Sequence, residues 1–284
     1  MLEVRGMLRD AIWRPVQRWQ RIARAKTRER ADEARFVCPV CDYRGIFIDA
    51  PGPLGARKYG SCPRCGSMER HRLQAMALEI ILRDSDPAVK SALHFAPEPG
   101  IGKILHRRFG RYRTADLLPG GVDIVGDMRD LPLADASFDF IFASHVLEHI
   151  AEDRRAIAEL YRILKPGGVA VLPVPIVCDA TIEYPGPVAS EDGHVRGPGP
   201  DYFDRYWESF DAVQVLTSAD FPEDRQLYIY EDRSDAPNDA TPYRTPMFGE
   251  RHLDYVPVCL KRPCSFVVTA PLTPLAKPAG ASVH

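Results

Sequence analysis

Short apolar segments alternate with amphipathic ones across the middle of this chain. Apolar runs occupy residues 93–96, 138–143 and 169–174, and apolar positions recur at helical spacing over residues 153–164. Short apolar strands separated by helical segments are typical of βαβ units and a parallel sheet. The pattern therefore predicts an α/β fold, in which ligands bind where the carboxyl ends of the strands meet.

Polar side chains stand at the ends of these predicted strands. Asp116 ends the strand over residues 111–116, Asp127 and Met128 follow the next, and Ser144 and His145 follow the strand over residues 138–143. Because parallel strands end at the same edge of a sheet, we expect these side chains to gather around one site.

The motifs in this region resemble the class I S-adenosylmethionine (SAM)-dependent methyltransferases, in particular the type-11 group. The motifs are Val125-Gly126-Asp127-Met128, Phe138-Asp139 and Leu164-Lys165-Pro166-Gly167-Gly168. The resemblance covers roughly residues 90–215. It implies a doubly wound, mostly parallel, seven-stranded Rossmann-like sheet that is closed by an antiparallel hairpin of strands near residues 210–216 and 255–261.

The resemblance also implies SAM as cofactor and methyl transfer as the reaction. It assigns the ribose hydroxyls to Asp116, the adenine to Asp127 and Met128, and the exposed side of the cofactor to Ser144 and His145. The full set of cofactor-binding residues that it implies is His94, Ala96, Glu98, Gly100, Asp116, Leu117, Asp127, Met128, Ser144 and His145.

The loop after the first strand departs from the family pattern of acidic-x-Gly-x-Gly-x-Gly. His94 replaces the acidic residue, Ala96 and Glu98 replace the first two glycines, and Gly100 keeps the third. One interpretation is that Glu98 supplies a carboxylate near the ammonium of SAM. The alternative is a site that no longer serves SAM, in a non-catalytic interaction protein.

A Pro/Gly-rich stretch over residues 175–200 follows the fifth strand, where loops over a cofactor site bind acceptors. His194 is a candidate general base because an unperturbed imidazole titrates near neutrality, and His145 is the second candidate. Arg196, Tyr202 and Arg205 are candidate substrate-binding residues for an anionic or hydroxyl-rich acceptor. We therefore expect a small-molecule or glycan-type acceptor, with a lid that has no acid–base role as the alternative.

Two Cys-x-x-Cys pairs stand near the N-terminus, at Cys38/Cys41 and Cys62/Cys65. This spacing predicts a zinc ribbon over residues 36–67 that holds one tetrahedral Zn²⁺. Four thiolates leave no open coordination position, which favours a structural role over substrate or partner recognition. The chain has seven cysteines, and an odd number also favours a metal site in a reducing compartment.

A second metal site is a further hypothesis for the segment that follows the fourth strand. On a helix, His145 and His149 would lie one turn apart with Glu148 beside them, a spacing that can hold a metal. The alternative is that Glu148 forms local pairs and His149 packs beneath the site.

Residues 1–35 read as one basic amphipathic helix, which predicts either peripheral membrane contact or packing on the protein itself. The net charge is −2, so nothing global indicates nucleic acid, although an RNA methyltransferase that grips RNA through the ribbon is an alternative. No apolar run spans a bilayer and no signal peptide is evident, so a cytoplasmic protein is expected. The methyltransferase domain is expected over residues 68–270, with a disordered tail over 271–284.

Overall fold

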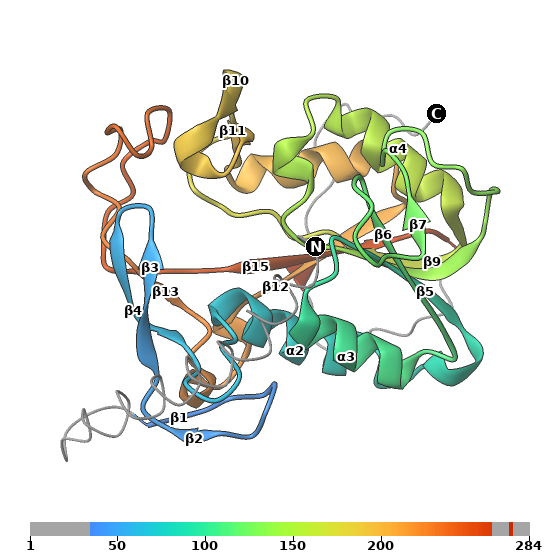
Figure 1. The fold of residues 1–284 in the computed structure, drawn as a ribbon, viewed down its shortest axis with the longest axis horizontal. Helices are drawn as coiled ribbons and strands as arrows, with labels where there is room; N and C mark the ends of the chain where they lie inside the picture. The colour runs from blue at the N-terminus through green and yellow to red at the C-terminus, as the bar shows by residue number, and fades with distance from the viewer. Residues whose placement is uncertain (1–34, 263–272, 275–284) are drawn as a thin grey trace, which may run out of the picture.

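One central sheet organises the computed structural model, which describes residues 35–262 and 273–274 (Figure 1). Its strand order is β16-β12-β15-β9-β8-β5-β6-β7. Strands β5 to β9 pair in parallel, whereas β15 pairs antiparallel with both β9 and β12. The strands are β5 (Ser91–Phe95), β6 (Arg111–Asp116), β7 (Ile124–Val125), β8 (Phe138–Ala143), β9 (Leu164–Val171), β12 (Ala212–Thr217), β15 (Tyr255–Leu260) and β16 (Thr273–Pro274).

This topology confirms the doubly wound, mostly parallel sheet predicted from the sequence. The antiparallel hairpin partner β15 lies between β9 and β12, as the resemblance implies. The two-residue strand β16 adds an eighth strand at the edge, where it pairs with β12. The central strands β5 and β8 are buried along almost their whole length because both of their faces are covered, whereas β6 nearer the edge is partly exposed.

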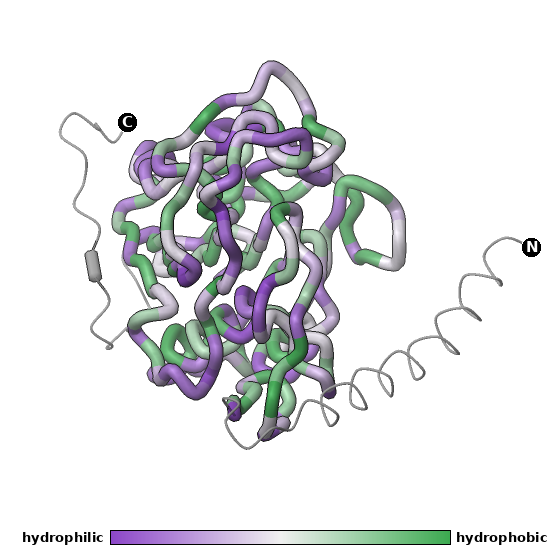
Figure 2. The backbone as a smooth tube through the Cα atoms, turned by 90° about the vertical axis from the view of Figure 1, so that its left-hand side faces the viewer, coloured by the Kyte–Doolittle hydropathy of each residue, from purple (hydrophilic) through white to green (hydrophobic). Residues whose placement is uncertain are grey.

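Two helical layers bury the sheet (Figure 1). Helices α2 (Glu69–Ile81) and α3 (Pro99–Arg108) pack with side chains such as Phe140 and Val171 on one face. Helix α4 (Asp153–Ile163) and the 3-10 segment η4 (Pro200–Glu208) pack with Ile141 and Ala170 on the other. Hydrophobic and hydrophilic stretches accordingly alternate along the chain in Figure 2.

Short hairpins lie outside the central sheet. The N-terminal pairs are β1 (Phe36–Val37) with β2 (Arg44–Gly45) and β3 (Ile48–Gly52) with β4 (Gly55–Ser61), which lie together at one end of the molecule (Figure 1). The other two pairs are β10 (Ile182–Val188) with β11 (His194–Gly197), and β13 (Ile229–Tyr230) with β14 (Arg251–His252). The remaining 3-10 turns are η1 (Pro87–Val89), η2 (Leu147–His149), η3 (Ala189–Glu191), η5 (Ser218–Asp220) and η6 (Glu223–Arg225).

A buried arginine joins the N-terminal hairpins to the main body. Arg72 of α2 is fully buried and donates hydrogen bonds to the carbonyl oxygens of Tyr59, Gly60, Ser67 and Gln226, at 2.6–3.4 Å. Its guanidinium carbon also lies 4.6 Å from the centroid of the Phe47 ring. Because these partners come from distant parts of the chain, Arg72 fixes the N-terminal segment against α2.

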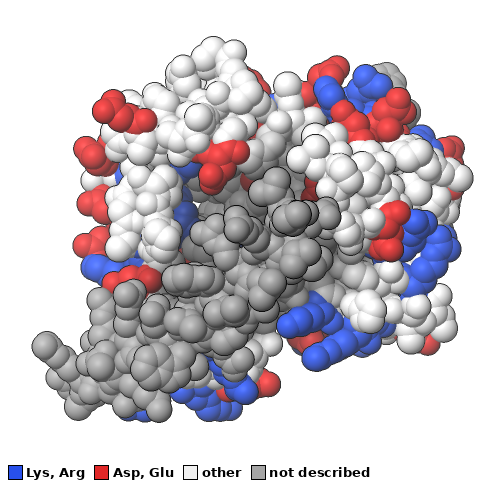
Figure 3. Space-filling view, in the orientation of Figure 1, with Lys and Arg blue, Asp and Glu red and all other residues white. Residues whose placement is uncertain are grey.

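Two expectations fall outside the described residues: the basic helix over residues 1–35, apart from Arg35, and the tail over 271–284, apart from the strand β16. Within residues 35–262 and 273–274, no helix is long and apolar enough to cross a membrane. The described part of the face in Figure 3 carries both acidic and basic side chains.

Candidate functional site

A pocket of about 730 Å³ opens at the carboxyl ends of β5, β6, β7 and β8. Strand-end residues form its floor, and residues of the β10–β11 hairpin form its opposite wall. Its lining consists of Phe95, Ala96, Asp116, Leu117, Gly126, Asp127, Met128, Arg129, His145, Val146, His149, Ile150, Ala151, Glu183, Tyr184, Pro185, Gly186, Pro187 and Val195. The volume lies within the range of small-molecule sites.

Six of the residues expected to bind the cofactor line this one pocket: Ala96, Asp116, Leu117, Asp127, Met128 and His145. The Asp116 carboxylate ends β6 and accepts a hydrogen bond from the backbone N–H of Leu118, at 3.2 Å. Leu117 beside it is 63% exposed and offers apolar surface to the pocket. This part of the pocket therefore presents one carboxylate next to apolar surface.

The next strand end carries a tightly held carboxylate. The Arg129 guanidinium donates to both oxygens of Asp127, at 2.6–3.1 Å, and also to Glu152 at 2.7 Å. The hydrogen bonds from Arg129 lower the pKa of Asp127 to about 2, so this side chain is a carboxylate at neutral pH. Met128 is buried beside it and supplies an apolar surface.

Two strand ends at the pocket adopt left-handed backbone conformations. Ala96 has φ 45° and His145 has φ 54°, although neither is glycine. A hydrogen bond fixes each backbone N–H: Ala96 donates to Ala115 O and His145 donates to Pro173 O, both at 2.9 Å. Non-glycine residues rarely adopt this region, and such residues cluster at binding and active sites.

Four of the residues expected at the cofactor do not line the pocket, and these placements are not what the sequence predicted. His94 is fully buried within β5, where its Nδ1 lies 2.9 Å from the Tyr112 hydroxyl. Burial lowers the pKa of His94 to about 4, so its ring is neutral and replaces the family's acidic residue without charge. Ser144 is buried behind His145 and accepts a hydrogen bond from Gln74 at 2.7 Å.

Glu98 and Gly100 stand at the N-terminus of α3, away from the pocket. The Glu98 carboxylate accepts hydrogen bonds from His71 Nε2 at 2.8 Å and from Arg70 at 3.2 Å. Burial alone would raise the pKa of Glu98, but His71 and Arg70 lower it to about 2. A side chain on Gly100 would contact Val40, at 3.7 Å. Glu98 thus pairs with Arg70 and His71 of α2, and it does not line the pocket.

The three residues expected to bind substrate form an interior network instead. Tyr202 and Arg205 donate hydrogen bonds to the buried Asp153 carboxylate, at 2.7 and 2.5 Å. Arg196 is almost fully buried and donates to the carbonyl oxygens of Leu147, Ile150 and Ala151, at 2.6–2.9 Å. Arg196 and Arg205 also contact Glu183, which does line the pocket. In the described structure these residues therefore support the wall of the pocket.

The hairpin wall lies in the Pro/Gly-rich stretch where the sequence placed acceptor binding. Residues 183–187 of β10 and Val195 of β11 face the strand ends across the pocket. Glu183 and Val195 belong to two short segments that stand out in the sequence of that stretch, Thr181-Ile182-Glu183 and His194-Val195-Arg196, whereas residues 184–187 had no signal beyond the stretch itself.

A cluster of imidazoles surrounds a buried carboxylate at the base of this hairpin. Glu148 of η2 is fully buried, and its Oε1 lies 3.4 Å from His145 Nδ1 and 4.0 Å from both His149 Nε2 and His194 Nε2. Burial lowers the pKa of His194 to about 4. His145 and His149 line the pocket, whereas His194 is 9% exposed and lies behind them.

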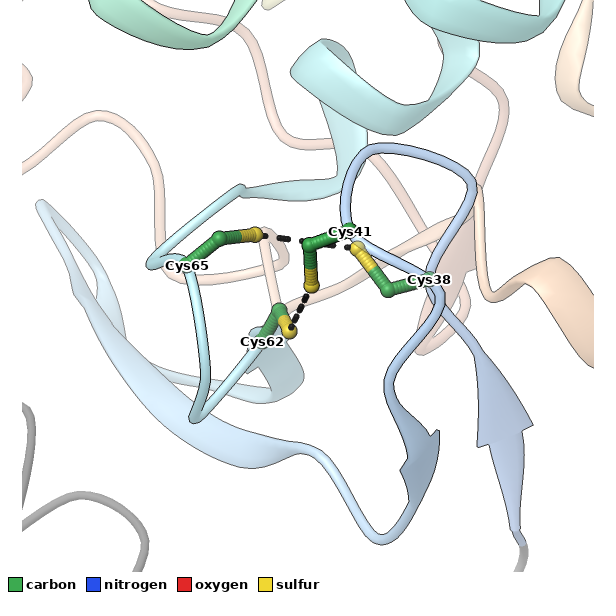
Figure 4. Close-up of side chains that lie close together, drawn as sticks. All are labelled: Cys38, Cys41, Cys62 and Cys65. Atoms are coloured by element: carbon green, nitrogen blue, oxygen red, sulfur yellow. Dashed lines mark hydrogen bonds between the residues drawn. The ribbon is translucent and has the colours of Figure 1, made fainter.

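The four paired cysteines meet in a second cluster at the N-terminal end (Figure 4). Cys38 Sγ lies 3.7 Å from Cys65 Sγ, and Cys41 Sγ lies 3.7 Å from Cys62 Sγ. Thiolates about 2.3 Å from one tetrahedral zinc ion would be about 3.8 Å apart, so this donor set fits Zn²⁺. Each pair is held by a tight turn, in which Asp42 N donates to Cys38 O and Gly66 N donates to Cys62 O.

The four thiols of this cluster shift one another's pKa values. The hydrogen bond from Cys41 lowers the pKa of Cys38 to about 6, and hydrogen bonds from its thiol neighbours also lower the pKa of Cys65. The same contacts raise the pKa of Cys41 and Cys62. Four thiolates at this spacing repel one another, so a bound cation is needed to keep all of them ionised.

Comparison with known proteins identifies the central segment. Residues 103–172 match a family model described as a methyltransferase domain. A malonyl-[acyl-carrier protein] O-methyltransferase of Serratia marcescens is 35% identical over 78 residues, which are 24% of this chain and 31% of that protein. A ubiquinone/menaquinone biosynthesis C-methyltransferase of Methylobacterium nodulans is 42% identical over 60 residues, 21% of this chain and 24% of that protein. The chain thus spans less than a third of the length of these relatives.

A solved SAM-dependent methyltransferase of Mesorhizobium loti aligns with 66% of this chain and 97% of its own, with a TM-score of 0.43 and 15% identity. The family match and the strand order confirm the resemblance to the class I methyltransferases that the motifs indicated.

Proposed function

We propose that this chain, which resembles the class I methyltransferases over residues 103–172, is a SAM-dependent methyltransferase with a small-molecule or glycan-type acceptor. The observation that carries this proposal is the position of Asp116 and Asp127 at neighbouring strand ends around one pocket. Met128 and Leu117 add the apolar surface that an adenine ring requires. The relatives named above, whose printed activities are O- and C-methyl transfer, support the same reaction class.

Each strand end has a distinct role in this proposal. Asp116 accepts hydrogen bonds from the ribose hydroxyls, as acidic residues at this position of open α/β sheets do. Asp127, held by Arg129, accepts a hydrogen bond from the adenine amino group while Met128 packs on the ring. Ala96 supplies the bare backbone against which the methionine part of SAM lies, because a methyl side chain takes little room.

The reaction depends mainly on alignment. SAM, when bound, supplies a methyl group on a sulfonium, which an acceptor atom displaces in line. The hairpin wall, through Tyr184 and Val195, orients the acceptor against the strand ends and excludes water. His145, whose Nδ1 is held 3.4 Å from Glu148, is the candidate that accepts the proton of the acceptor, because it lines the pocket and His194 does not.

The cysteine cluster has a structural role in this proposal. We assign the ribbon of residues 36–67 one Zn²⁺ held by Cys38, Cys41, Cys62 and Cys65, and the methyltransferase domain the residues that follow. With all four positions taken by thiolates, the ion has no open site for chemistry. A segment this short builds too small a core to fold alone, so metal binding supplies its folding free energy.

Isothermal titration calorimetry with SAM tests the function. We expect the wild-type protein to bind SAM, and Asp116→Ala to weaken binding about 10- to 100-fold, because a hydrogen bond to a charged group is worth about 1.5–3 kcal/mol. Asp135→Ala is the matched control, since its side chain is 79% exposed and lies outside the pocket. Absence of SAM binding in the wild type, or equal affinity in Asp116→Ala, would overturn the proposal.

A further inference from the structure

The most unusual group near the pocket is the carboxylate of Glu148. It is fully buried, and neither of its oxygens has a hydrogen-bond partner in the described structure. Buried polar groups in folded proteins nearly always have partners, because an unpaired buried charge costs several kcal/mol. His145 Nδ1 lies 3.4 Å from Glu148 Oε1, yet no hydrogen bond satisfies either oxygen, and this points to a missing cation or ligand.

The neighbours of this carboxylate are imidazole nitrogens. His149 Nε2 and His194 Nε2 each lie 4.0 Å from Glu148 Oε1, which is too far for a hydrogen bond. The ligand atoms of Glu148, His149 and His194 all lie within 4.8 Å of one another. Ligands about 2.1 Å from one tetrahedral ion are about 3.4 Å apart, so the separations in this cluster would have to shorten by up to about 1.4 Å when an ion binds.

From this geometry we propose that Glu148, His149 and His194 form a binding site for a divalent first-row transition-metal ion. Two imidazoles and one carboxylate are a common donor set for Zn²⁺ and Fe²⁺, and they leave coordination positions open. This site is separate from the cysteine cluster, whose four sulfur donors leave no position open. It also differs from the set that the sequence suggested, because His194 from a distant strand is the third ligand and His145 is beside the cluster.

The two protein segments that supply the ligands are already fixed to each other. Arg196 follows His194 in β11 and donates to three carbonyl oxygens around η2, which carries Glu148 and His149. The His149 and His194 rings pack against each other edge to face, at 83° with centroids 4.8 Å apart. Ligands held in place before the ion arrives lose less conformational entropy on binding.

The open positions of the ion would face the pocket, because His149 lines it. An acceptor that carries an oxygen donor, such as a hydroxyl or carboxylate, would complete the coordination and be held next to the strand ends. This last step, the class of acceptor, rests on the proposed methyltransferase function; the cation site itself does not.

Cobalt binding tests the proposal without any acceptor. Co²⁺ is added to the full-length protein that already holds one Zn²⁺ per chain, and binding is followed by visible absorption. We expect one equivalent of Co²⁺ with the weak bands of nitrogen and oxygen ligands, without the sulfur-to-cobalt charge transfer that marks exchange into the cysteine cluster. Glu148→Gln and His194→Ala should each weaken Co²⁺ binding at least about 10-fold.

His106→Ala is the control because His106 is exposed on α3, and its Co²⁺ affinity should match the wild type. If circular dichroism shows that one of the buried substitutions prevents folding, the Co²⁺ affinity of His149→Ala tests the site in its place. The His149 side chain is already 36% exposed, so its removal should not disturb the fold. Absence of Co²⁺ binding, or an unchanged affinity in the ligand variants, would overturn the proposal. Co²⁺ binding without SAM binding would support the cation site and overturn the methyltransferase function. SAM binding without Co²⁺ binding would support the function and overturn the cation site.

Discussion

The two side-chain clusters of this protein are built in opposite ways. The cysteine cluster takes its sulfur atoms from two short local pairs, which would enclose a bound ion with four sulfurs (Figure 4), and it stands at one end of the molecule (Figure 1). The cluster of Glu148, His149 and His194 joins two segments distant in sequence and stands beside the pocket. The difference is that between a closed site, which can only stabilise, and an open one, which can also bind a ligand.

Both clusters nevertheless share a supporting device. A buried arginine stands behind each one: Arg72 is 0% exposed and Arg196 is 1% exposed. Each donates to backbone carbonyl oxygens of the segments that carry the ligands, at Gly60 and Ser67 for Arg72, and at Leu147 and Ile150 for Arg196. The guanidinium is suited to this because its donors are arranged in a rigid plane and it remains charged when buried.

Loss of the proposed structural zinc should have the largest effect on stability. Cys62→Ser removes a fully buried thiolate ligand, so we expect the free energy of unfolding to fall by about 4 kcal/mol or more and the bound zinc to fall from one ion per chain toward zero. Urea unfolding and metal analysis measure the two quantities on the same sample.

Cys178→Ser is the matched control, because Cys178 is equally buried but lies outside the cluster. Burying the new hydroxyl should cost about 1–2 kcal/mol while the zinc content stays at one. If the two variants lose the same stability and the same zinc, the cysteine cluster is not a metal site.

The arginine behind the cysteine cluster should have the next largest effect. Arg72→Met keeps much of the buried volume but leaves four carbonyl oxygens without their donor, so we expect a loss of about 3 kcal/mol. Zinc should also be bound less tightly, because Arg72 holds the carbonyl oxygens of Gly60 and Ser67 beside the second cysteine pair. Lys58→Met, in an exposed pair with Glu250, should change stability by less than about 0.5 kcal/mol.

Arg196→Met is the variant that best distinguishes the cysteine cluster from the cluster of Glu148, His149 and His194. We expect a smaller loss of stability, about 2 kcal/mol, because Arg196 braces fewer carbonyl oxygens and one of its partners, Glu183, is 54% exposed. Unlike Arg72→Met, this variant should also weaken Co²⁺ binding about 10-fold, since β11 and η2 would no longer hold His194 and His149 together. If Arg72→Met weakens Co²⁺ binding to the same extent, the two clusters are not independent.

Local spacing explains which features the sequence predicted. The cysteine pairs meet because each pair is fixed by a single turn, and the strand order brings Asp116, Asp127 and His145 to one edge because parallel strands end together. These placements need only the order and direction of the strands. The six residues of the predicted cofactor set that line the pocket all come from such strand ends.

Contacts between distant segments explain what the sequence did not predict. Glu98 is directed to His71 and Arg70 of α2, a contact that depends on how that helix packs and that the sequence does not show. His194 joins Glu148 only because the β10–β11 hairpin folds back over η2. Arg196, Tyr202 and Arg205 looked like surface recognition residues because they are polar, and the partner that buries Tyr202 and Arg205, Asp153, gives no sign of this in the sequence.

The smallest expected effect on stability comes from Glu98, which connects the loop after β5 to helix α2. His71 Nδ1 accepts a hydrogen bond from Met68 N, so its Nε2 carries the hydrogen that it donates to Glu98. The folded-state pKa of Glu98, about 2, is below the ordinary value of 4.5. Its contribution is therefore present above about pH 4.5 and is lost as the pH falls toward 2.

Glu98→Gln should lower the free energy of unfolding by about 1 kcal/mol at pH 7, because the carboxylate is partly exposed and its pairing is screened by solvent. The difference from wild type should shrink steadily when urea unfolding is repeated from pH 6 down to pH 3, since the wild-type side chain is then increasingly protonated in the unfolded state. Neither zinc content nor Co²⁺ affinity should change, because Glu98 contacts neither cluster in the described structure. A stability difference that stays constant with pH would mean that Glu98 acts by packing and not by charge, and a change in Co²⁺ affinity would mean that the two regions are coupled through this link.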